Sequence, residues 1–339
     1  MSLKRIAEEL GLSLTTVSRA LNGYPEVAAT TRREVMEAAA RLHYRPDARA
    51  RGLALGRADA VGIVFPITTG DLGDQQFLQV ASSMGKRFAQ ASMDLLIVSA
   101  SADDELAAYE RAITGRHIGV FVVPRTRVAD RRLQLLQSRN VPFVAYGRSS
   151  TLTEPYAWFD FDNLAGARMA AERLLSLGHR RIGYIGAYPE YNFADQRFNG
   201  FCGALKAENV TIAADAVQRV ALDRRSGYAA MQNLLALPNR PTAVLVDNNL
   251  AGIGAVHAAM HSGLMLGRDL SIIVYDGVGP DSVVRARVTA VMQPTPEATG
   301  VTLAEMTLAR MRNAPLDTLQ KLCMPELEIG DSDGPPVLP

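Results

Sequence analysis

The sequence lacks several features that would place it in common protein classes. Its 339 residues include only two cysteines, Cys202 and Cys323, which are far apart and belong to no Cys-x-x-Cys pair. This excludes a disulfide framework and a cysteine-based metal site. No apolar run approaches the roughly 18 residues that span a bilayer, and the charged first ten residues do not resemble a signal peptide. A cytoplasmic protein without a membrane segment is expected.

Motifs for nucleotide and metal chemistry are also missing. The chain has no Gly-x-Gly-x-x-Gly after a strand and no Gly-Lys-Ser or Gly-Lys-Thr phosphate loop. Its five histidines form no close set, and His257 and His261, four residues apart, have no adjacent glutamate and are interpreted as surface or packing residues. We therefore predict no cofactor, no metal and no catalytic residue, and an enzyme is the first alternative to be weighed.

The charge is divided unevenly along the chain. Residues 1–57 hold ten lysines and arginines against six acidic residues, a net charge of +4, whereas the whole chain carries +1. A basic head on a mildly acidic body suggests that the head meets a polyanion. The length exceeds what one hydrophobic core usually serves, so more than one folding unit is expected.

Helical spacing of apolar residues marks three short helices in the head, assigned to residues 1–46. The first ends near Leu10 before Gly11, and the second runs from Leu14 to Asn22. The third is predicted to begin at the capping-box pattern Thr31-x-x-Glu34. The order of helix, glycine-containing turn and helix is typical of a helix-turn-helix, whose second helix enters the major groove of DNA.

The residues of the second helix have the chemistry needed to contact DNA. Arg19 can donate two hydrogen bonds to guanine, Thr15 can bond either type of base, and Leu14 can contact a thymine methyl group. Four short donors suit phosphate oxygens: Ser13, Thr16, Ser18 and Asn22. Taken alone, the pattern fits equally well a surface helix whose polar residues are simply solvated.

The segment 47–57 is basic, rich in alanine and too short for a stable isolated helix. Arg49 suits a phosphate, and Leu53 with Ala54 offers an apolar edge that could insert between base steps in the minor groove. We interpret the segment as a hinge that orders on DNA. The alternative is an ordinary interdomain linker.

From residue 58 to 339, short apolar strands alternate with helices, which predicts two doubly wound parallel sheets and hence an α/β body of two lobes. The first set of strands is Val61–Phe65, Leu95–Val98, Gly119–Val123 and Phe143–Tyr146. The second set is Ala157–Asp160, Ile182–Ile185, Ala243–Val246 and Ile272–Tyr275. We assign 58–156 and 290–320 to the first lobe, and 157–289 and 321–330 to the second.

Polar residues follow the predicted strands of the second lobe, where ligands of such sheets bind. Asp276 follows one strand, Asn248 follows another, and Arg197 opens a helix after a turn. A carboxylate, an amide and a guanidinium together suit the hydroxyl groups of a sugar. Each also fits a local role: Asp276 could cap a turn, Asn248 could start a helix, and Arg197 could pair with a surface acid.

From end to end the chain resembles the LacI/GalR family of transcription regulators. The resemblance rests on Leu-Ser-Leu-Thr-Thr-Val-Ser-Arg-Ala-Leu-Asn at 12–22, on Tyr44-Arg45-Pro46, on Leu53-Ala54, and on the motifs around Arg197, Asn248 and Asp276. It implies base reading by Leu14, Thr15 and Arg19, a DNA-contacting Tyr44, and insertion of Leu53 into the minor groove. It also implies a homodimer on a pseudo-palindromic DNA operator and a body like that of periplasmic binding proteins.

The first lobe offers further candidates for effector contacts. They are Thr68, Asp71, Gln76 and Phe77, with Phe77 as a candidate stacking surface for a sugar, and each fits equally well a packing or loop residue. Gly147-Arg148 occupies the strand end where relatives often have Asp and another residue, and Leu222 stands where some have an aromatic residue. These departures leave the identity of the effector open.

The expected function is a sequence-specific repressor in the bacterial cytoplasm, associated with the nucleoid and released from DNA by a sugar or glycoside. A non-sugar metabolite, or an effector acting as co-repressor, is the alternative within the same family. A periplasmic-type binding protein would share the body, and only the head and the missing signal peptide separate the two.

Overall fold

The fold is described from a computed structural model that covers residues 3–21, 23–42, 44, 60–66, 74–101, 104–115, 117–279, 282, 284 and 286–337. Residues 1–59 and 60–339 form two compact units, the head and the body. In the head, α1 (Leu3–Leu10), α2 (Leu14–Leu21) and α3 (Ala29–Arg41) enclose a small core that includes Ile6, Val17 and Val35. The predicted end of the first helix at Leu10 is confirmed.

The starts of α2 and α3 differ in how they are capped. Ser13 precedes α2, and its hydroxyl accepts a hydrogen bond from the Thr16 backbone N–H at 3.1 Å. The predicted capping box at Thr31 is wrong, because α3 begins at Ala29 and its N-cap residue Ala28 makes no side-chain cap. Alanine favours helix strongly, so the helix extends upstream of Thr31 and leaves that residue inside it.

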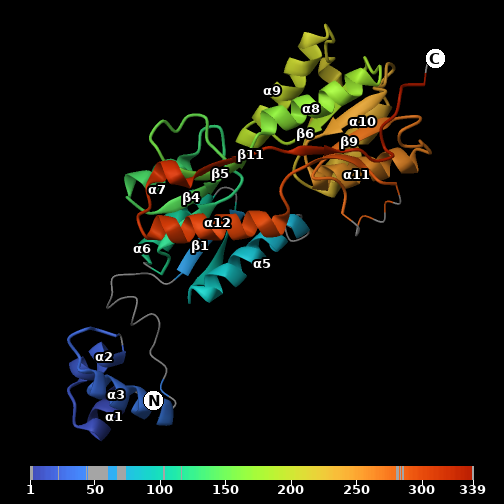
Figure 1. The fold of residues 1–339 in the computed structure, drawn as a ribbon. Coiled ribbons are helices and arrows are strands. Elements are labelled where there is room, and N and C mark those ends of the chain that lie inside the picture. Colours follow the sequence, from blue (N-terminus) through green and yellow to red (C-terminus); the bar gives the residue numbers. More distant parts are fainter. Residues whose placement is uncertain are drawn as a thin grey trace. The chain divides into compact units, whose positions relative to one another are not determined.

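The first sheet of the body has six parallel strands in the described part of the chain. Their order is β11 (Gln320–Cys323), β5 (Ala157–Phe161), β4 (Phe143–Tyr146), β3 (Val120–Val123), β1 (Ala60–Pro66) and β2 (Asp94–Ala100). The helices α5 (Gln75–Gln90) and α12 (Pro296–Met311) pack on one face, and α6 (Glu105–Thr114) and α7 (Arg131–Ser138) pack on the other. Figure 1 shows α5 and α12 side by side.

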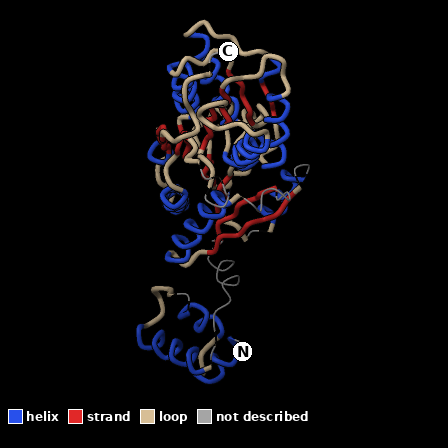
Figure 2. Tube along the Cα trace, turned by 90° about the vertical axis from the view of Figure 1, so that its right-hand side faces the viewer, coloured by secondary structure: helices blue, strands red, loops and turns tan. Residues whose placement is uncertain are grey.

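The second sheet has the same plan with one antiparallel edge. Its order is β12 (Glu326–Glu328), β10 (Thr289–Met292), β9 (Ser271–Tyr275), β8 (Ala243–Val246), β6 (Ile182–Gly186) and β7 (Val217–Arg219). The helices α8 (Asn163–Ser176) and α9 (Asn192–Ala207) cover one face, and α10 (Arg224–Leu235) and α11 (Asn249–His261) cover the other. Figure 2 shows helices on both sides of the strands in the body.

The expected pair of doubly wound sheets is confirmed, but the assignment of residue ranges to the two lobes was wrong in three places. The strand at 157–161 pairs in the first sheet, not the second. The strand at 289–292 pairs in the second sheet, and the strand at 320–323 pairs in the first. The chain therefore crosses between the lobes after β5, after β10 and after β11. The pairing of β11 with β5 joins residues about 160 positions apart, and an alternation of strands and helices does not reveal after which strand the chain crosses from one lobe to the other.

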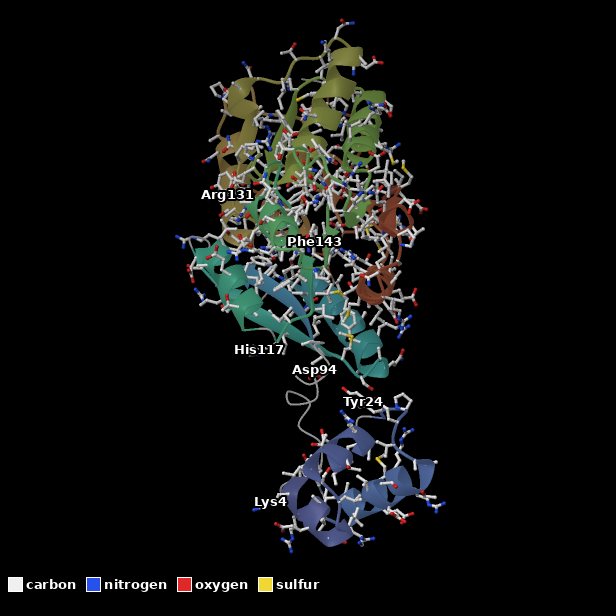
Figure 3. The ribbon with its side chains drawn as sticks, turned by 90° about the vertical axis from the view of Figure 1, so that its left-hand side faces the viewer. Lys4, Tyr24, Asp94, His117, Arg131 and Phe143 are labelled. Atoms are coloured by element: carbon white, nitrogen blue, oxygen red, sulfur yellow. The ribbon has the colours of Figure 1, made fainter. Side chains whose placement is uncertain are left out.

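Parallel strands give each sheet of the body one edge of amino ends and one edge of carboxyl ends. Asp94 begins β2 and His117 precedes β3, so both mark the amino-end edge of the first sheet, and Figure 3 shows them together at one margin of the body. The polar residues that follow the strands gather at the opposite edge.

A close approach of two helices positions the part of the second lobe that carries Arg197. Gly200 on α9 lies against α8, and a Cβ atom there would overlap the carbonyl oxygen of Leu164. Gly203, three residues along the same helix, has no atom within 4 Å of the place where its Cβ would lie. The absence of a side chain is therefore a packing requirement at the first position only.

We expect the two glycines to respond in opposite ways to alanine. Gly200→Ala forces α9 away from α8 and lowers the free energy of unfolding of the body by about 1–3 kcal/mol. Gly203→Ala raises it by up to about 1 kcal/mol, because alanine favours helix. Urea unfolding followed by circular dichroism measures both. Equal stability of the two variants would contradict the packing argument.

Candidate functional site

A cavity of about 250 Å³ lies at the carboxyl ends of the strands of both lobes. Segments that follow strands of both sheets contribute to its wall, and the crossovers after β5 and β10 border it. Seven of the nine predicted effector residues line this cavity: Gln76, Phe77, Arg148, Arg197, Leu222, Asn248 and Asp276. Thr68 and Asp71 lie outside the described residues. The structure thus brings together side chains that are up to 200 positions apart in the chain.

Arg197 is the most constrained charged group of the cavity. It is 5% exposed, so the surface ion pair considered from sequence is not what holds it. Its Nε donates to Asn163 Oδ1 at 2.8 Å, and its Nη1 donates to the backbone carbonyl of Asp247. The guanidinium also lies 3.7 Å from the centre of the Tyr275 ring. These contacts fix the guanidinium at the junction of three segments of the second lobe.

Asp276 follows β9 in a left-handed backbone conformation, with φ of 60°. Burial raises the pKa of its carboxyl group to about 6, and Asp74 adds to this rise, whereas Arg197 and the Gln293 backbone N–H oppose it. Across the cavity, Gln76 Nε2 donates to the backbone carbonyl of Asp276 at 3.3 Å. The carboxyl group is thus an acceptor that titrates near neutral pH.

Asn248 and the preceding Asp247 support the floor of the cavity. Asn248 Oδ1 accepts from the Ala251 backbone N–H at 2.9 Å and caps α11, so the local role considered from sequence is present. Its Nδ2 donates to Asp247 Oδ1 at 2.8 Å. Asp247 is fully buried, accepts from the Ala187 backbone N–H, and has its pKa raised by burial. Asn248 therefore borders the cavity with its amide already engaged.

The first lobe contributes an aromatic and ionic wall. Phe77 stacks on Phe65 with ring centres 4.3 Å apart, which leaves one ring face of Phe77 for other contacts. Arg125 lies over Phe65 and pairs with Asp74 at 3.4 Å, and Asp74 caps α5 by accepting from the Phe77 backbone N–H. The wall is held together by these contacts within the lobe.

Several residues of the cavity were not predicted from sequence: Asp74, Arg125, Tyr146, Asp160, Asn163, Asn192, Phe193 and Gln293. Most of them follow β3, β4, β5, β6 or β10, so the rule that ligands bind beyond the carboxyl ends of strands would have found them if applied to every strand. Gln293 was missed because β10 was not recognised. Tyr146 keeps its proton, since burial raises the pKa of its hydroxyl group.

The head presents its predicted DNA-contacting residues in different ways. Leu14, Thr15 and Arg19 are exposed on α2, whose Val17 and Ala20 are buried. Ser13 caps this helix with its hydroxyl, Thr16 and Ser18 are partly buried, and Tyr44 packs against the head core. The remaining predicted contacts lie outside the described residues: Asn22, Arg49, Leu53 and Ala54.

Among the residues that the structure describes, no group of three or more His, Cys, Asp or Glu side chains could hold a metal ion. No helix within the described ranges is long and apolar enough to cross a membrane.

Comparisons with known proteins place this architecture. The model for bacterial regulatory proteins of the lacI family matches residues 2–47, and the model for a periplasmic binding protein-like domain matches residues 171–332. The HTH-type transcriptional regulator RafR of Escherichia coli is 37% identical over 325 residues, which cover 94% of this chain and 95% of that protein.

Solved structures agree with these matches. The complex of the transcriptional regulator CelR with cellobiose has a TM-score of 0.74 at 25% identity, covering 98% of this chain and 99% of that chain. The lac repressor dimer bound to operator and the anti-inducer ONPF has a TM-score of 0.82 at 23% identity, covering 98% of each chain, and shows the shared fold. The chain therefore belongs to the LacI family and is a helix-turn-helix transcription regulator.

Proposed function

We propose that this regulator is a homodimeric repressor that binds a pseudo-palindromic DNA operator and is released by an uncharged carbohydrate bound between the lobes of its body. Chromosomal DNA as its target implies a place in the bacterial cytoplasm, at the nucleoid. The proposal assigns no catalytic role to the cavity, since the relatives are regulators of transcription.

The balance of charge in the cavity supports the proposal that the ligand is uncharged. Three aspartates and three arginines line it, and they are matched: Asp74 with Arg125, Asp160 with Arg148, and Asp276 with Arg197. A phosphorylated or carboxylated ligand would find each cation already compensated by an acid. A polyol can donate to the carboxylates and accept from the guanidinium groups without adding charge.

Aromatic side chains support a carbohydrate over other uncharged polar ligands. Phe77, Phe161, Phe193 and Tyr146 line the same cavity and can pack against the C–H faces of a sugar ring. A relative with the same fold, CelR, has been solved in complex with cellobiose. The proposed effector contacts are Thr68, Asp71, Gln76, Phe77, Arg148, Arg197, Leu222, Asn248 and Asp276.

For the head, we propose base reading by the exposed Leu14, Thr15 and Arg19, with backbone positioning by Ser13, Thr16, Ser18, Asn22 and Tyr44. The hinge at 47–57 would add a phosphate contact from Arg49 and minor-groove insertion of Leu53 and Ala54. A two-fold operator requires two heads, which a dimer of the body would supply.

An apolar surface of the first lobe supports dimerisation. The edge strand β2 exposes Leu96 and Ile97, and the neighbouring helix α5 exposes Leu78. An uncovered apolar edge strand is an aggregation hazard that proteins usually cover. We propose that a second copy of the chain covers this surface.

The proposed switch is a shift between two arrangements of the lobes. Few hydrogen bonds join the lobes beside the cavity: Asn192 N–H donates to the Thr126 carbonyl at 2.9 Å, and Val128 N–H donates to the Glu190 carbonyl at 2.9 Å. Thr126 and Asn192 also line the cavity. A ligand that binds one arrangement more tightly shifts the population toward it by that difference in affinity. The shift would pass to the hinge and lower operator affinity, and operator would reciprocally lower ligand affinity.

A sugar screen tests the proposed effector class. We expect at least one of D-glucose, D-galactose, D-mannose, sucrose, lactose, maltose and cellobiose to raise the melting temperature, because a ligand of the folded state stabilises it by about 2.7 kcal/mol at 100 times its Kd. The same sugar should release the protein from duplexes selected from a random pool, followed by fluorescence anisotropy. Tighter DNA binding would instead make the sugar a co-repressor, and binding only of non-sugar metabolites would reject the carbohydrate proposal.

The raised pKa of Asp276 predicts a pH-dependent sugar affinity. Above about pH 6 the carboxylate accepts from sugar hydroxyl groups, and protonation below that pH should weaken binding about five- to tenfold because a charged acceptor is the stronger one. Calorimetric titration between pH 5 and pH 8, a range of about one to two units on either side of this pKa, measures the change.

The Asp276→Asn variant is the control for this titration. It should bind weakly at every pH and lose the pH dependence. In the unliganded wild type, the carboxyl pKa is raised from 3.8 to about 6, so the free energy of unfolding falls as pH rises through this window. The variant should not show that fall. An unchanged pH profile of sugar binding in the variant would contradict the role given to Asp276.

Arg19 and Arg49 should affect DNA binding in different ways. Arg19→Ala removes a bidentate base contact, so discrimination between the selected site and sites mutated at one base pair should fall by about 1–3 kcal/mol at that base pair. Arg49→Ala should weaken binding to all duplexes and reduce the slope of log affinity against log salt by about one. Anisotropy titrations at several salt concentrations separate the two effects. Unchanged base preference in Arg19→Ala would refute its proposed role.

A further inference from the structure

Arg148, at the end of β4, is held in the cavity wall by one carboxylate. Its backbone N–H and its Nε donate to the same oxygen, Asp160 Oδ2, at 3.3 and 2.8 Å. The guanidinium also lies 5.2 Å from the centre of the Trp158 ring. Its terminal nitrogens, Nη1 and Nη2, have no hydrogen-bond partner among the described residues, although Arg148 borders the cavity. The side chain is anchored at one edge, and its fork of donors is unused.

Asp160 is itself fixed, so it can orient Arg148. It is 3% exposed, and its other oxygen, Oδ1, accepts from the Phe161 backbone N–H at 2.8 Å and from Asn163 Nδ2 at 3.3 Å. A carboxylate satisfied on both oxygens does not need a ligand. Its function toward the cavity is to position Arg148 and to neutralise it.

The crossover after β10 has a second unused donor. Gln293 lines the cavity, and its Nε2 is buried without a hydrogen-bond partner among the described residues. Its backbone N–H bonds to the Asp276 carboxyl group. An unpaired buried donor is unfavourable, so a ligand that supplies an acceptor there removes this penalty.

Resting on the proposed carbohydrate effector, we propose that Arg148 is a specificity-determining residue that recognises a pair of neighbouring oxygens on that sugar. The two terminal nitrogens donate in one plane, which matches vicinal hydroxyl groups or a ring oxygen and its neighbouring hydroxyl. Asp160 is the positioning residue that fixes the direction of the fork.

Recognition by Arg148 also ties the sugar to the first lobe. Arg148 follows a strand of the first sheet, whereas Arg197 and Asp276 belong to the second lobe. A sugar that is bound by all three residues is in contact with both lobes at once. The pair of oxygens that Arg148 recognises therefore contributes both to the selection of the sugar and to the link between the lobes.

A double-mutant cycle between protein and ligand tests this role. The probe is the tightest sugar from the screen above, together with each of its monodeoxy derivatives, titrated calorimetrically into the full-length chain. With wild type, removal of one of the recognised hydroxyl groups should weaken binding about tenfold, because a hydrogen bond to a charged donor is lost. With Arg148→Gln, the parent sugar should bind about tenfold more weakly, and removal of the same hydroxyl should then change affinity less than about twofold.

Arg139→Gln is the matched control, since Arg139 is an exposed arginine at the end of α7 that does not line the cavity. It should retain both the affinity and the discrimination of wild type. A melting curve of each unliganded variant reports whether it is folded. Arg148→Lys keeps the charge without the planar fork. It should recover part of the affinity for the parent sugar, but removal of the recognised hydroxyl should not weaken its binding as it does with wild type.

The outcomes separate this inference from the proposed function. If no sugar binds wild type, the carbohydrate proposal fails and the role of Arg148 fails with it. If sugars bind but Arg148→Gln weakens the whole deoxy series by one common factor, the residue has only a structural effect and the inference alone is overturned. If a uronic acid or a sugar phosphate binds wild type more tightly than the neutral sugar, Arg148 recognises an anion and the inference is also overturned.

Discussion

The burial of the Arg197 guanidinium is the constraint on which the second lobe and its cavity depend. A charge that is removed from water needs hydrogen bonds to stabilise it. Here the guanidinium donates to Asn163 on the crossover after β5 and to the Asp247 carbonyl after β8. Tyr275 is the last residue of β9, and its ring covers the cation. One side chain thus joins the crossover to two strand ends. Because α9 carries Arg197, the glycine that lets this helix approach α8 also sets where the cation lies.

Compensation of charge extends from this group across the cavity. Arg125 and Arg148 each pair with an aspartate of the first lobe, so this lobe neutralises its cavity cations before any ligand arrives. Asp276 is different, because burial and Asp74 together outweigh the attraction of Arg197 and raise its pKa. Folding therefore leaves this carboxyl group in an unfavourable setting. Hydroxyl groups of a ligand would donate hydrogen bonds to this carboxylate and stabilise it. The buried position that favours ligand binding is therefore unfavourable for folding.

How much of this could be read from sequence differs between the elements. The helix-turn-helix and most strands have strong local periodicity, so their positions were predicted closely, and the rule about strand ends located Asn248 and Asp276. Arg197 was predicted to open a helix, but it lies inside α9, which begins at Asn192. The capping pattern at Thr31 failed because helix propensity upstream outweighed it. β5 pairs on one side with β4, which precedes it in the chain, and on the other side with β11, about 160 residues later, and no local pattern contains the second pairing. Asp160 was missed because the rule about strand ends was not applied to its strand, and Gln293 was missed because β10 was not recognised.

The crossovers also explain how a ligand can act on the relation between lobes without unfolding either. Each lobe has cores on both faces of its own sheet, whereas beside the cavity the lobes meet through a few hydrogen bonds such as that from Gln76 to the Asp276 carbonyl. Well-packed cores resist deformation, so change concentrates where contacts are sparse. The ligand contacts proposed above, from Arg148 on one lobe and Arg197 and Asp276 on the other, would be comparable in number to these bonds. A small molecule can then decide between two arrangements, because the free energy it adds is of the same order as the free energy that separates them.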